Sequence, residues 1–338
     1  MKKNRLLKYG LLFVVLAAVL VFSGFMYLKT QYSPVAATDG EIINVVIPER
    51  AAASQIGKLL KDNQLIKSEM AFNIYLRQTG LATRLRPGHY SFSRSQSLQE
   101  IISDIAQGKT EVSLFTVPEG YTVEKIGNLL VSKGLIADYL LWEQALSREY
   151  DYAFLPAGNP GQKYLLEGYL FPDTYSAPIG TKPEDIINMM LQNFEQKWEK
   201  DFASIAGEKK MTLEEVIIIA SMVEREAQIA SDRGIIAGVI KNRLDRGMLL
   251  QICATVLYCL DEEKTELSYA DLEIESPYNT YINSGLPPGP IACPGSASIY
   301  AALEPETHDY LYYVAKGDGS HYFSRTYQEH LEAIKIYQ

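Results

Sequence analysis

Two glutamates interrupt an apolar segment and are the residues best suited to chemistry. The segment 213–227 reads LEEVIIIASMVEREA, with Glu224 and Glu226 near its end. In a helix Glu224 shares a side with apolar or small residues. A carboxyl group held against such a face is costly to ionise, so it would keep its proton near neutrality and suit a general acid. The residues on that side are Leu213, Ile217, Ala220 and Ala227, with Ser221 at the margin.

A structural interpretation competes with the catalytic one, because buried glutamates often pair with an arginine or bond to backbone groups. Glu226 lies beside another apolar stripe, so periodicity does not separate the two acids. The small side chains around Glu224 would leave room for a ligand. This favours Glu224 as the catalytic acid and leaves Glu226 as a secondary one.

A helix must position these acids. Thr212 can cap it, and Glu215 stands at the capping-box spacing. Helical sequence is expected to continue to Asp245, with a break near 231–232. Two segments rich in proline, glycine and asparagine follow at 276–281 and 284–295. Such segments hold a fixed path without forming a core, and we expect them to rim a binding cleft rather than to be plain surface connections.

Two internal repeats precede this helix. Residues 46–66 recur at an offset of 70 as residues 116–136, each copy a strand ending in Pro-Glu and then an amphipathic helix. A second repeat, at an offset of 85, relates the segments around Tyr90 and Tyr175. Two copies are too few for a solenoid. The prediction is two small α/β modules, the first free-standing and the second built into a larger domain.

The N-terminus has the pattern of a membrane anchor. Residues 9–28 carry no charge, which is about the length that crosses a bilayer as a helix. Four basic residues precede the run, which places the tail 1–8 in the cytoplasm. The sequence therefore predicts a single-pass protein of the cell membrane, with a linker at 29–40 and the rest outside. A cleavable signal peptide is the alternative, but its apolar core would usually be shorter.

Composition restricts the class of partner. Beyond position 29 the chain has 27 basic and 41 acidic residues, a formal charge of −14. A domain so acidic is poorly suited to bind nucleic acid. A neutral polar polymer or a protein suits it better, and the faces of the 23 tyrosines are of the kind that pack against sugar rings. Neither the three cysteines nor the four histidines have metal-ligand spacing, so no metal or cofactor is expected.

The chain resembles the endolytic murein transglycosylase family, YceG-like, membrane-anchored enzymes that cut nascent peptidoglycan strands. The resemblance covers nearly everything after the anchor and is densest from Leu166 onward. Seven ordered motifs carry it: Leu166–Tyr175, Ala220–Glu226, Asn242–Leu244, Leu250–Gln251 with Thr255–Val256 and Tyr258, Tyr278–Tyr281, Gly285–Ile291 and Pro294–Gly295.

The resemblance implies two regions with different functions. Residues 41–110 would form a LysM-like glycan-binding module, and residues 111–338 a larger α+β catalytic domain. Glu224 matches the family's catalytic acid. The candidates to orient the sugars are Glu167, Gln251, Thr255, Asn279 and Tyr281. Peptidoglycan synthases or division proteins are the partners that such an enzyme would meet.

The chain departs from the family pattern at Cys253, where many relatives have an acid. This chain therefore lacks the carboxylate that those relatives have at this position. Because the family brings the segments of Cys253 and Cys293 towards the cleft, the resemblance also suggests a disulfide between them, which a count of free thiols would test.

The implied reaction needs one acid. Glu224 would protonate the oxygen between N-acetylmuramic acid and N-acetylglucosamine, and the muramic 6-hydroxyl would close on C1 to leave a 1,6-anhydro end. One alternative is a muramidase that hydrolyses the same bond, with Glu226 or Glu167 as second carboxylate. The other is a non-catalytic wall-binding scaffold for division, in which Glu224 is a core residue.

Overall fold

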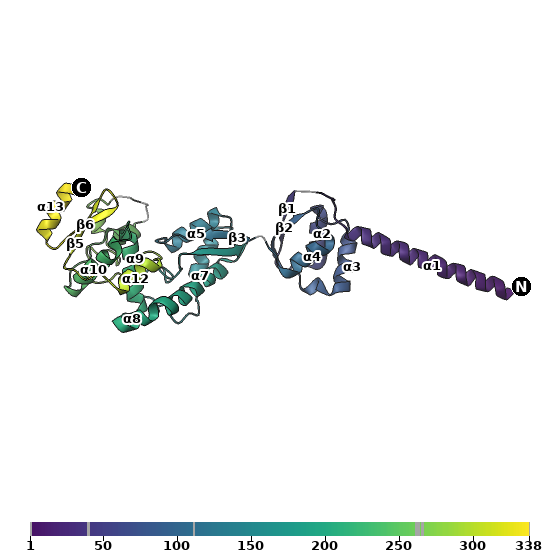
Figure 1. Cartoon of the computed structure of the whole chain (residues 1–338), viewed down its shortest axis with the longest axis horizontal. Helices are drawn as coiled ribbons and strands as arrows, with labels where there is room; N and C mark the ends of the chain where they lie inside the picture. The colour runs from purple at the N-terminus through teal and green to yellow at the C-terminus, as the bar shows by residue number, and fades with distance from the viewer. Residues whose placement is uncertain (1, 39–40, 111, 261–263, 265–266, 338) are drawn as a thin grey trace. The chain divides into compact units, whose positions relative to one another are not determined.

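The computed structural model describes residues 2–38, 41–110, 112–260, 264 and 267–337. The chain has the mixed α+β composition that was predicted, with helices and three two-stranded sheets in the described residues. It divides into two compact units (Figure 1). The first contains residues 1–113 and 178–180, and the second contains residues 114–177 and 181–338.

The N-terminal helix α1 (Lys2–Tyr32) corrects one expectation. The side chains of residues 1–14, 17 and 21 lie outside the described part of the chain. Crossing a bilayer takes about 20 consecutive apolar residues, and no helix within the described residues reaches that combination of length and apolarity. This finding contradicts the predicted transmembrane helix at 9–28, and with it the single-pass location in the cell membrane.

The rest of the first unit packs two strands against helices. Strand β1 (Ile42–Ile47) pairs antiparallel with β2 (Gly88–Ser93), and Val45 lies opposite Tyr90. Because strand side chains alternate between faces, one face of the pair turns towards the helices and is buried. The helices are α2 (Ala53–Asp62), α3 (Glu69–Thr79) and α4 (Leu98–Gln107). The core contains Ile47, Leu60, Phe72, Tyr90 and Ile101.

The same order of elements then recurs. The second copy has two paired strands, β3 (Val112–Thr116) and β4 (Thr174–Pro178), with helices α5 (Val123–Ser132), α6 (Tyr139–Leu146) and α7 (Pro183–Lys197). In each copy a glycine lets two helices approach closely. A Cβ atom on Gly57 would lie 2.9 Å from the ring of Phe72, and one on Gly127 would lie 2.3 Å from Trp142. The repeat at an offset of 70 is therefore a repeated packing unit.

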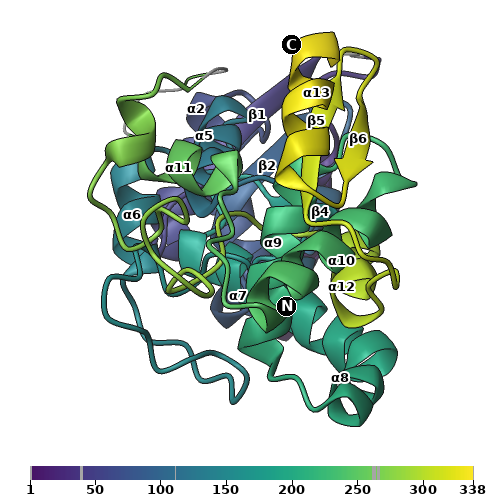
Figure 2. The ribbon, with the colours of Figure 1, turned by 90° about the vertical axis from the view of Figure 1, so that its left-hand side faces the viewer.

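The remainder of the second unit surrounds helix α9 (Leu213–Glu226). Every residue from Val216 to Val223 is buried, because α9 packs against neighbours on several sides. Figure 2 shows it beside α10 and α12. The other elements are a π-helical turn (Trp198–Phe202), α8 (Ala203–Lys209), α10 (Asp232–Asp245), α11 (Cys253–Cys259), α12 (Ser296–Leu303), β5 (Tyr312–Lys316), β6 (Ser320–Ser324) and α13 (Tyr327–Tyr337).

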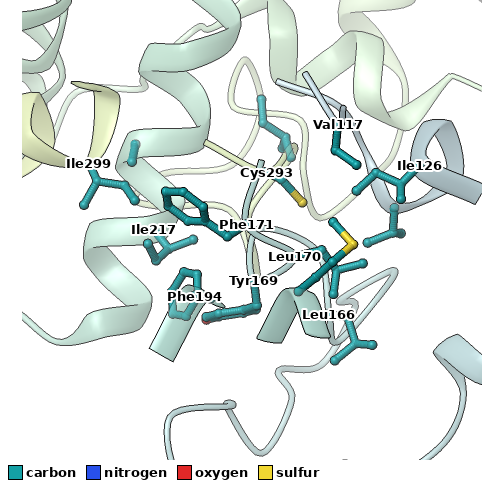
Figure 3. Packing of buried hydrophobic residues seen from close by; sticks show 14 of the residues in the cluster. Val117, Ile126, Leu166, Tyr169, Leu170, Phe171, Phe194, Ile217, Cys293 and Ile299 are labelled. Carbon is teal, nitrogen blue, oxygen red and sulfur yellow. The ribbon is translucent and has the colours of Figure 1, made fainter. Parts of the chain in front are cut away.

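The core of this unit joins α9 to two irregular segments. Figure 3 shows Ile217 of α9 near Tyr169 and Phe171, with Cys293 in the same cluster. The ring of Tyr169 meets that of Phe194 edge to face, at 5.4 Å between centroids. Burial of these large side chains therefore fixes the segments around 170 and 293 against the helix that carries the two acids.

Candidate active site

The site begins at the end of α9. The predicted capping box starts this helix, since Glu215 N–H donates to Thr212 Oγ1 at 3.2 Å and Thr212 N–H donates to Glu215 Oε2 at 2.9 Å. The helix ends at Glu226, so both acids lie in its last turn, and Glu224 has a side chain only 6% exposed. The backbone N–H of Gly295 donates to Glu224 Oε2 at 3.0 Å.

Two chain segments meet beside this carboxylate. Gly120 N–H donates to the carbonyl oxygen of Cys293 at 2.9 Å, and Cys293 N–H donates to that of Tyr121 at 2.8 Å. A Cβ atom on Gly120 would lie 3.5 Å from Cγ of Glu224, and the φ angle of Gly120 is +75°. Because that angle favours glycine, the segment can pass close to Glu224 at little strain.

A cation also reaches Glu224, which differs from the apolar setting that the helix pattern predicted. Arg233 Nη2, from α10, lies 3.5 Å from Glu224 Oε1. The guanidinium group is held by a second contact, because its Nε donates to the buried hydroxyl of Ser298 at 3.2 Å. The positive charge of Arg233 and the N–H of Gly295 thus hold the two oxygens of the carboxylate. The helical pattern could not predict them because they come from α10 and from Gly295, the residue before α12.

A second carboxylate, which the sequence analysis missed, lies at the same place. The ideal Cβ position of Gly295 is only 1.8 Å from Oε1 of Glu119, so the Glu119 carboxylate packs directly against Gly295. Partial burial raises the pKa of Glu119, and the negative charge of Glu224 raises it further, while Arg233 lowers it. The Pro-Glu repeat marked Glu119 and Glu49 equally, but it could not show which of them reaches α9.

Both carboxylate oxygens of Glu226, the proposed secondary acid, accept hydrogen bonds from other parts of the chain. Its Oε1 accepts the N–H of Ala254 at 3.2 Å, and its Oε2 accepts the hydroxyl of Tyr313 at 3.2 Å. Burial raises the pKa of Glu226, against the effect of these two hydrogen bonds. The side chain thus joins the end of α9 to the start of α11 and to β5.

Glu167 is fully buried rather than placed where a sugar could contact it. Its carboxylate accepts the N–H of Val123 at 3.1 Å and the hydroxyl of Tyr258 at 3.0 Å. Burial raises the pKa of Glu167 to about 8, although both hydrogen bonds act in the opposite direction. In this structure it links α5 to α11.

Gln251 is exposed and held by a buried arginine. Its side-chain oxygen accepts from Arg243 Nη1 at 3.2 Å, and its backbone N–H donates to the carbonyl oxygen of Thr280 at 3.0 Å. Its φ angle is +52°, an uncommon conformation for a residue with a side chain. Gln251 is thus held rigidly at the surface.

Of the other three predicted binding residues, Thr255 and Asn279 support the loops and Tyr281 is partly exposed. Thr255 is buried, and its hydroxyl lies 2.9 Å from that of Thr280. Asn279 is also buried and donates to the carbonyl oxygens of Leu272 and Ile274 at 3.0 and 2.9 Å. Burial raises the pKa of Tyr281, which is only partly exposed.

The cysteines do not form the suggested disulfide, because all three are free. Cys253 is exposed, and its Sγ lies 3.0 Å from the hydroxyl of Tyr281. Cys293 is fully buried, and its Sγ lies 3.9 Å from Oε1 of Glu167. The two thiols therefore have separate partners, one at the surface and one in the core.

A cavity of about 600 Å³ lies elsewhere in the second unit. Its lining includes Glu215 and Ile219, which belong to the first half of α9, but not Glu224. It also includes Lys241 of α10 and His308. The proline-rich segment 284–295, which was predicted to rim a cleft, contributes Leu286 to the lining of this cavity. Further along the same segment, the N–H of Ile291 donates to Ser221 Oγ of α9 at 3.1 Å.

Comparison with known proteins agrees with the resemblance seen in the motifs. A sequence profile of the YceG-like family matches residues 45–336. An endolytic murein transglycosylase of Bacillus subtilis is 36% identical over 332 residues, covering 94% of this chain and 91% of that protein. One from Streptococcus pneumoniae is 31% identical over 347 residues, covering 95% of this chain but only 63% of the relative.

A solved structure gives the same result. The crystal structure of a yceG-like protein from Listeria monocytogenes is 34% identical in sequence and superposes with a TM-score of 0.60. It covers 88% of this chain and 100% of the Listeria chain. The predicted family is thereby confirmed, and the chain belongs to the YceG-like family.

Proposed function

We propose that this chain is an endolytic murein transglycosylase in which Glu224 is the catalytic acid. One observation carries the assignment: the carboxylate of Glu224 is almost fully buried, yet a backbone N–H and a guanidinium group hold it in a fixed orientation. A carboxyl group with such defined partners is suited to proton transfer. The relatives named above supply the substrate class, the glycan strands of peptidoglycan.

The reaction uses the same carboxyl group twice. Glu224 donates its proton to the glycosidic oxygen as the bond from that oxygen to C1 breaks. The muramic 6-hydroxyl then forms a bond from O6 to C1, and its proton returns to Glu224. The product has a 1,6-anhydro end, and no water is consumed. The hydrogen bond from Gly295 and the charge of Arg233 would stabilise Glu224 in the ionised interval between the two transfers.

A second candidate, hydrolysis by a muramidase, draws its support from Glu119. A hydrolase needs two carboxyl groups on either side of the scissile bond. Glu226 and Glu167 are poorly suited to activating water, because their carboxylates are engaged by internal donors. Glu119 is the carboxylate that accompanies Glu224 at Gly295, so it is the group that a hydrolytic mechanism would use.

Digestion of purified peptidoglycan tests both candidates. The wild-type chain should release muropeptides with 1,6-anhydro ends, which mass spectrometry distinguishes from hydrolysis products because the latter contain an added water. Glu224→Gln should fold normally and lose activity by about 10²-fold or more. The matched control is Glu226→Gln, which removes the neighbouring acid of the same helix. Full activity in Glu224→Gln, or loss confined to Glu226→Gln, would contradict the assignment.

Roles for the remaining predicted residues follow from this proposal. Gln251 and Tyr281 are only partly enclosed and would orient sugars directly, whereas Glu167, Thr255 and Asn279 would act by holding the loops. The first unit would bind glycan as a LysM-like module. Association with peptidoglycan synthases or division proteins stays a prediction that co-purification would check.

A further inference from the structure

We infer that Asp232 is a positioning residue for this reaction, because its bonds to His321 fix the start of α10, the helix that brings Arg233 to Glu224. The inference rests on the proposed function of Glu224. Asp232 and His321 lie outside every motif that carried the family resemblance, and the reaction described above gives neither of them a role.

The start of α10 is not fixed by a local cap. Its N-cap residue, Ser231, makes no side-chain capping bond within the described residues, and its φ and ψ angles of −65° and −23° are helical rather than extended. Without a cap, the position of a helix start depends on contacts with other parts of the chain. In α10 such a contact comes from the first residue of the helix, Asp232, which is buried.

The carboxylate of Asp232 bonds to a strand 89 positions away in sequence. Its Oδ2 accepts the backbone N–H of His321 at 2.8 Å and lies 2.9 Å from His321 Nδ1. A carboxylate oxygen only accepts hydrogen bonds, so Nδ1 is the donor of the second one. His321 is also buried, and it belongs to β6, where it pairs with Ala315 of β5. Two bonds shielded from water therefore fix the start of α10 to the β5–β6 hairpin.

Arg233 is the next residue of α10, and its guanidinium group is fixed from another direction. Its Nε donates to Ser298 Oγ of α12 at 3.2 Å, and its Nη2 lies 3.5 Å from Glu224 Oε1. A distance of 3.5 Å is long for a hydrogen bond, so a small movement of the helix start would lose this contact. Asp232 thus fixes the backbone at Arg233, and Ser298 fixes the direction of the Arg233 side chain.

The geometry of Asp232 allows its position and its charge to be tested separately. Both donors of His321 bond to Oδ2, while Oδ1 accepts the hydroxyl of Ser231 at 3.3 Å. An asparagine can place its amide oxygen where Oδ2 lies and its NH2 group beside the Ser231 oxygen, which can accept. Asp232→Asn should therefore keep the contact with His321 without the charge, whereas Asp232→Ala loses both.

The test is the steady-state release of anhydro-muropeptides by the full-length chain, expressed per folded molecule. Asp232→Ala should lower kcat by about tenfold or more and change KM by less than about threefold, because displacement of a group that orients the catalytic carboxylate slows the chemical step. Asp232→Asn should stay within about threefold of the wild type. His321→Phe keeps an aromatic ring but loses Nδ1, and its kcat should fall between those of the two Asp232 variants.

The matched control is Asn242→Ala, at the other end of α10. Asn242 donates to the carbonyl oxygens of His308 and Tyr310 at 2.8 and 3.0 Å, so its loss also loosens α10 from the segment before β5. This variant should be less stable but keep the wild-type kcat, because it leaves the start of α10 in place.

A double-mutant cycle with Arg233→Ala shows whether Asp232 acts through Arg233. In that background Asp232→Ala should cost less than about twofold in kcat, because the contact that it would disturb is already missing. Two independent effects would multiply instead, and the loss of about tenfold would recur.

Three results would overturn the inference. The first is wild-type kcat in folded Asp232→Ala, and the second is an equal loss in Asp232→Asn, which would assign the effect to charge. The third is an undiminished loss in the Arg233→Ala background. If Asp232→Ala does not fold, His321→Phe takes its place in the same comparisons. Failure of the proposed function looks different, since Glu224→Gln would then remain active whatever the kcat of the Asp232 variants, and the inference would fall with it.

Discussion

The carboxylate of Glu119 occupies the space that a side chain on Gly295 would need, with 1.8 Å between its Oε1 and the ideal Cβ position. Gly295 has a φ angle of −81°, which any residue can adopt, so alanine would not strain the backbone there. A methyl group at this position would therefore displace the exposed side chain of Glu119.

Gly295→Ala should accordingly fold and push Glu119 away from Glu224. We expect a change in the free energy of unfolding below about 1 kcal/mol, together with altered kinetics of anhydro-muropeptide release. Gly317→Ala is the matched control, because a Cβ there meets nothing within 4 Å. Wild-type kinetics in Gly295→Ala would show that the position of Glu119 does not matter.

Ser221 fixes the proline-rich segment to α9. Its hydroxyl donates to the carbonyl oxygen of Ile218 at 2.8 Å and accepts the N–H of Ile291 at 3.1 Å. Ser221→Ala would leave that buried N–H without an acceptor, so it should destabilise the protein by about 1–3 kcal/mol in denaturant unfolding. Ser132→Ala is the control, since its hydroxyl makes the same bond to a preceding carbonyl but is exposed. Equal stability of both variants would count against this role.

Glu226 should matter for stability more than for chemistry. In Glu226→Gln the amide oxygen can still accept the N–H of Ala254, but the NH2 group must then donate to the Tyr313 oxygen, and the hydroxyl hydrogen of Tyr313 loses its buried acceptor. A loss of about 1–3 kcal/mol in the free energy of unfolding should follow, with activity per folded molecule largely retained. Tyr313→Phe removes one donor and should be milder. A fully stable but inactive Glu226→Gln would instead make Glu226 a catalytic residue.

Glu167 should make stability depend on pH. Burial raises its pKa to about 8 in the folded protein from an ordinary value of 4.5, so between these values the native state keeps a proton that the unfolded state has lost. Stability should therefore fall as the pH rises from about 5 to 8, by up to about 1.4 kcal/mol per unit from this group.

Glu167→Gln provides the measurement, because its side chain cannot ionise. Denaturant unfolding at several pH values should show the variant gaining stability relative to the wild type as the pH increases. Comparing the two proteins cancels the contribution of Glu226, whose pKa burial also raises. A difference between wild type and variant that is constant over this range would exclude Glu167 as the titrating group.

Local patterns predicted much of the fold. The capping box at Thr212 and the repeated strand–helix units depend on bonds or periodicities spanning a few residues. The same reasoning placed both acids in one helix. Recognition of the family likewise needed only ordered motifs, and the comparisons confirmed it. The transmembrane prediction rested on a run of uncharged residues alone, and the described helices contradict it.

Only the tertiary structure decided what surrounds each acid. The donor to Glu224 lies 71 positions away in sequence, and Arg233 reaches it from another helix. In the structure Glu167 and Cys293 are core residues, and the carboxylate of Glu119 packs against Gly295, whose N–H donates to Glu224. The physical reason is that periodicity determines which face of a helix a residue occupies. The partner on that face depends on how distant segments pack, and in this chain that packing sets the charge beside Glu224.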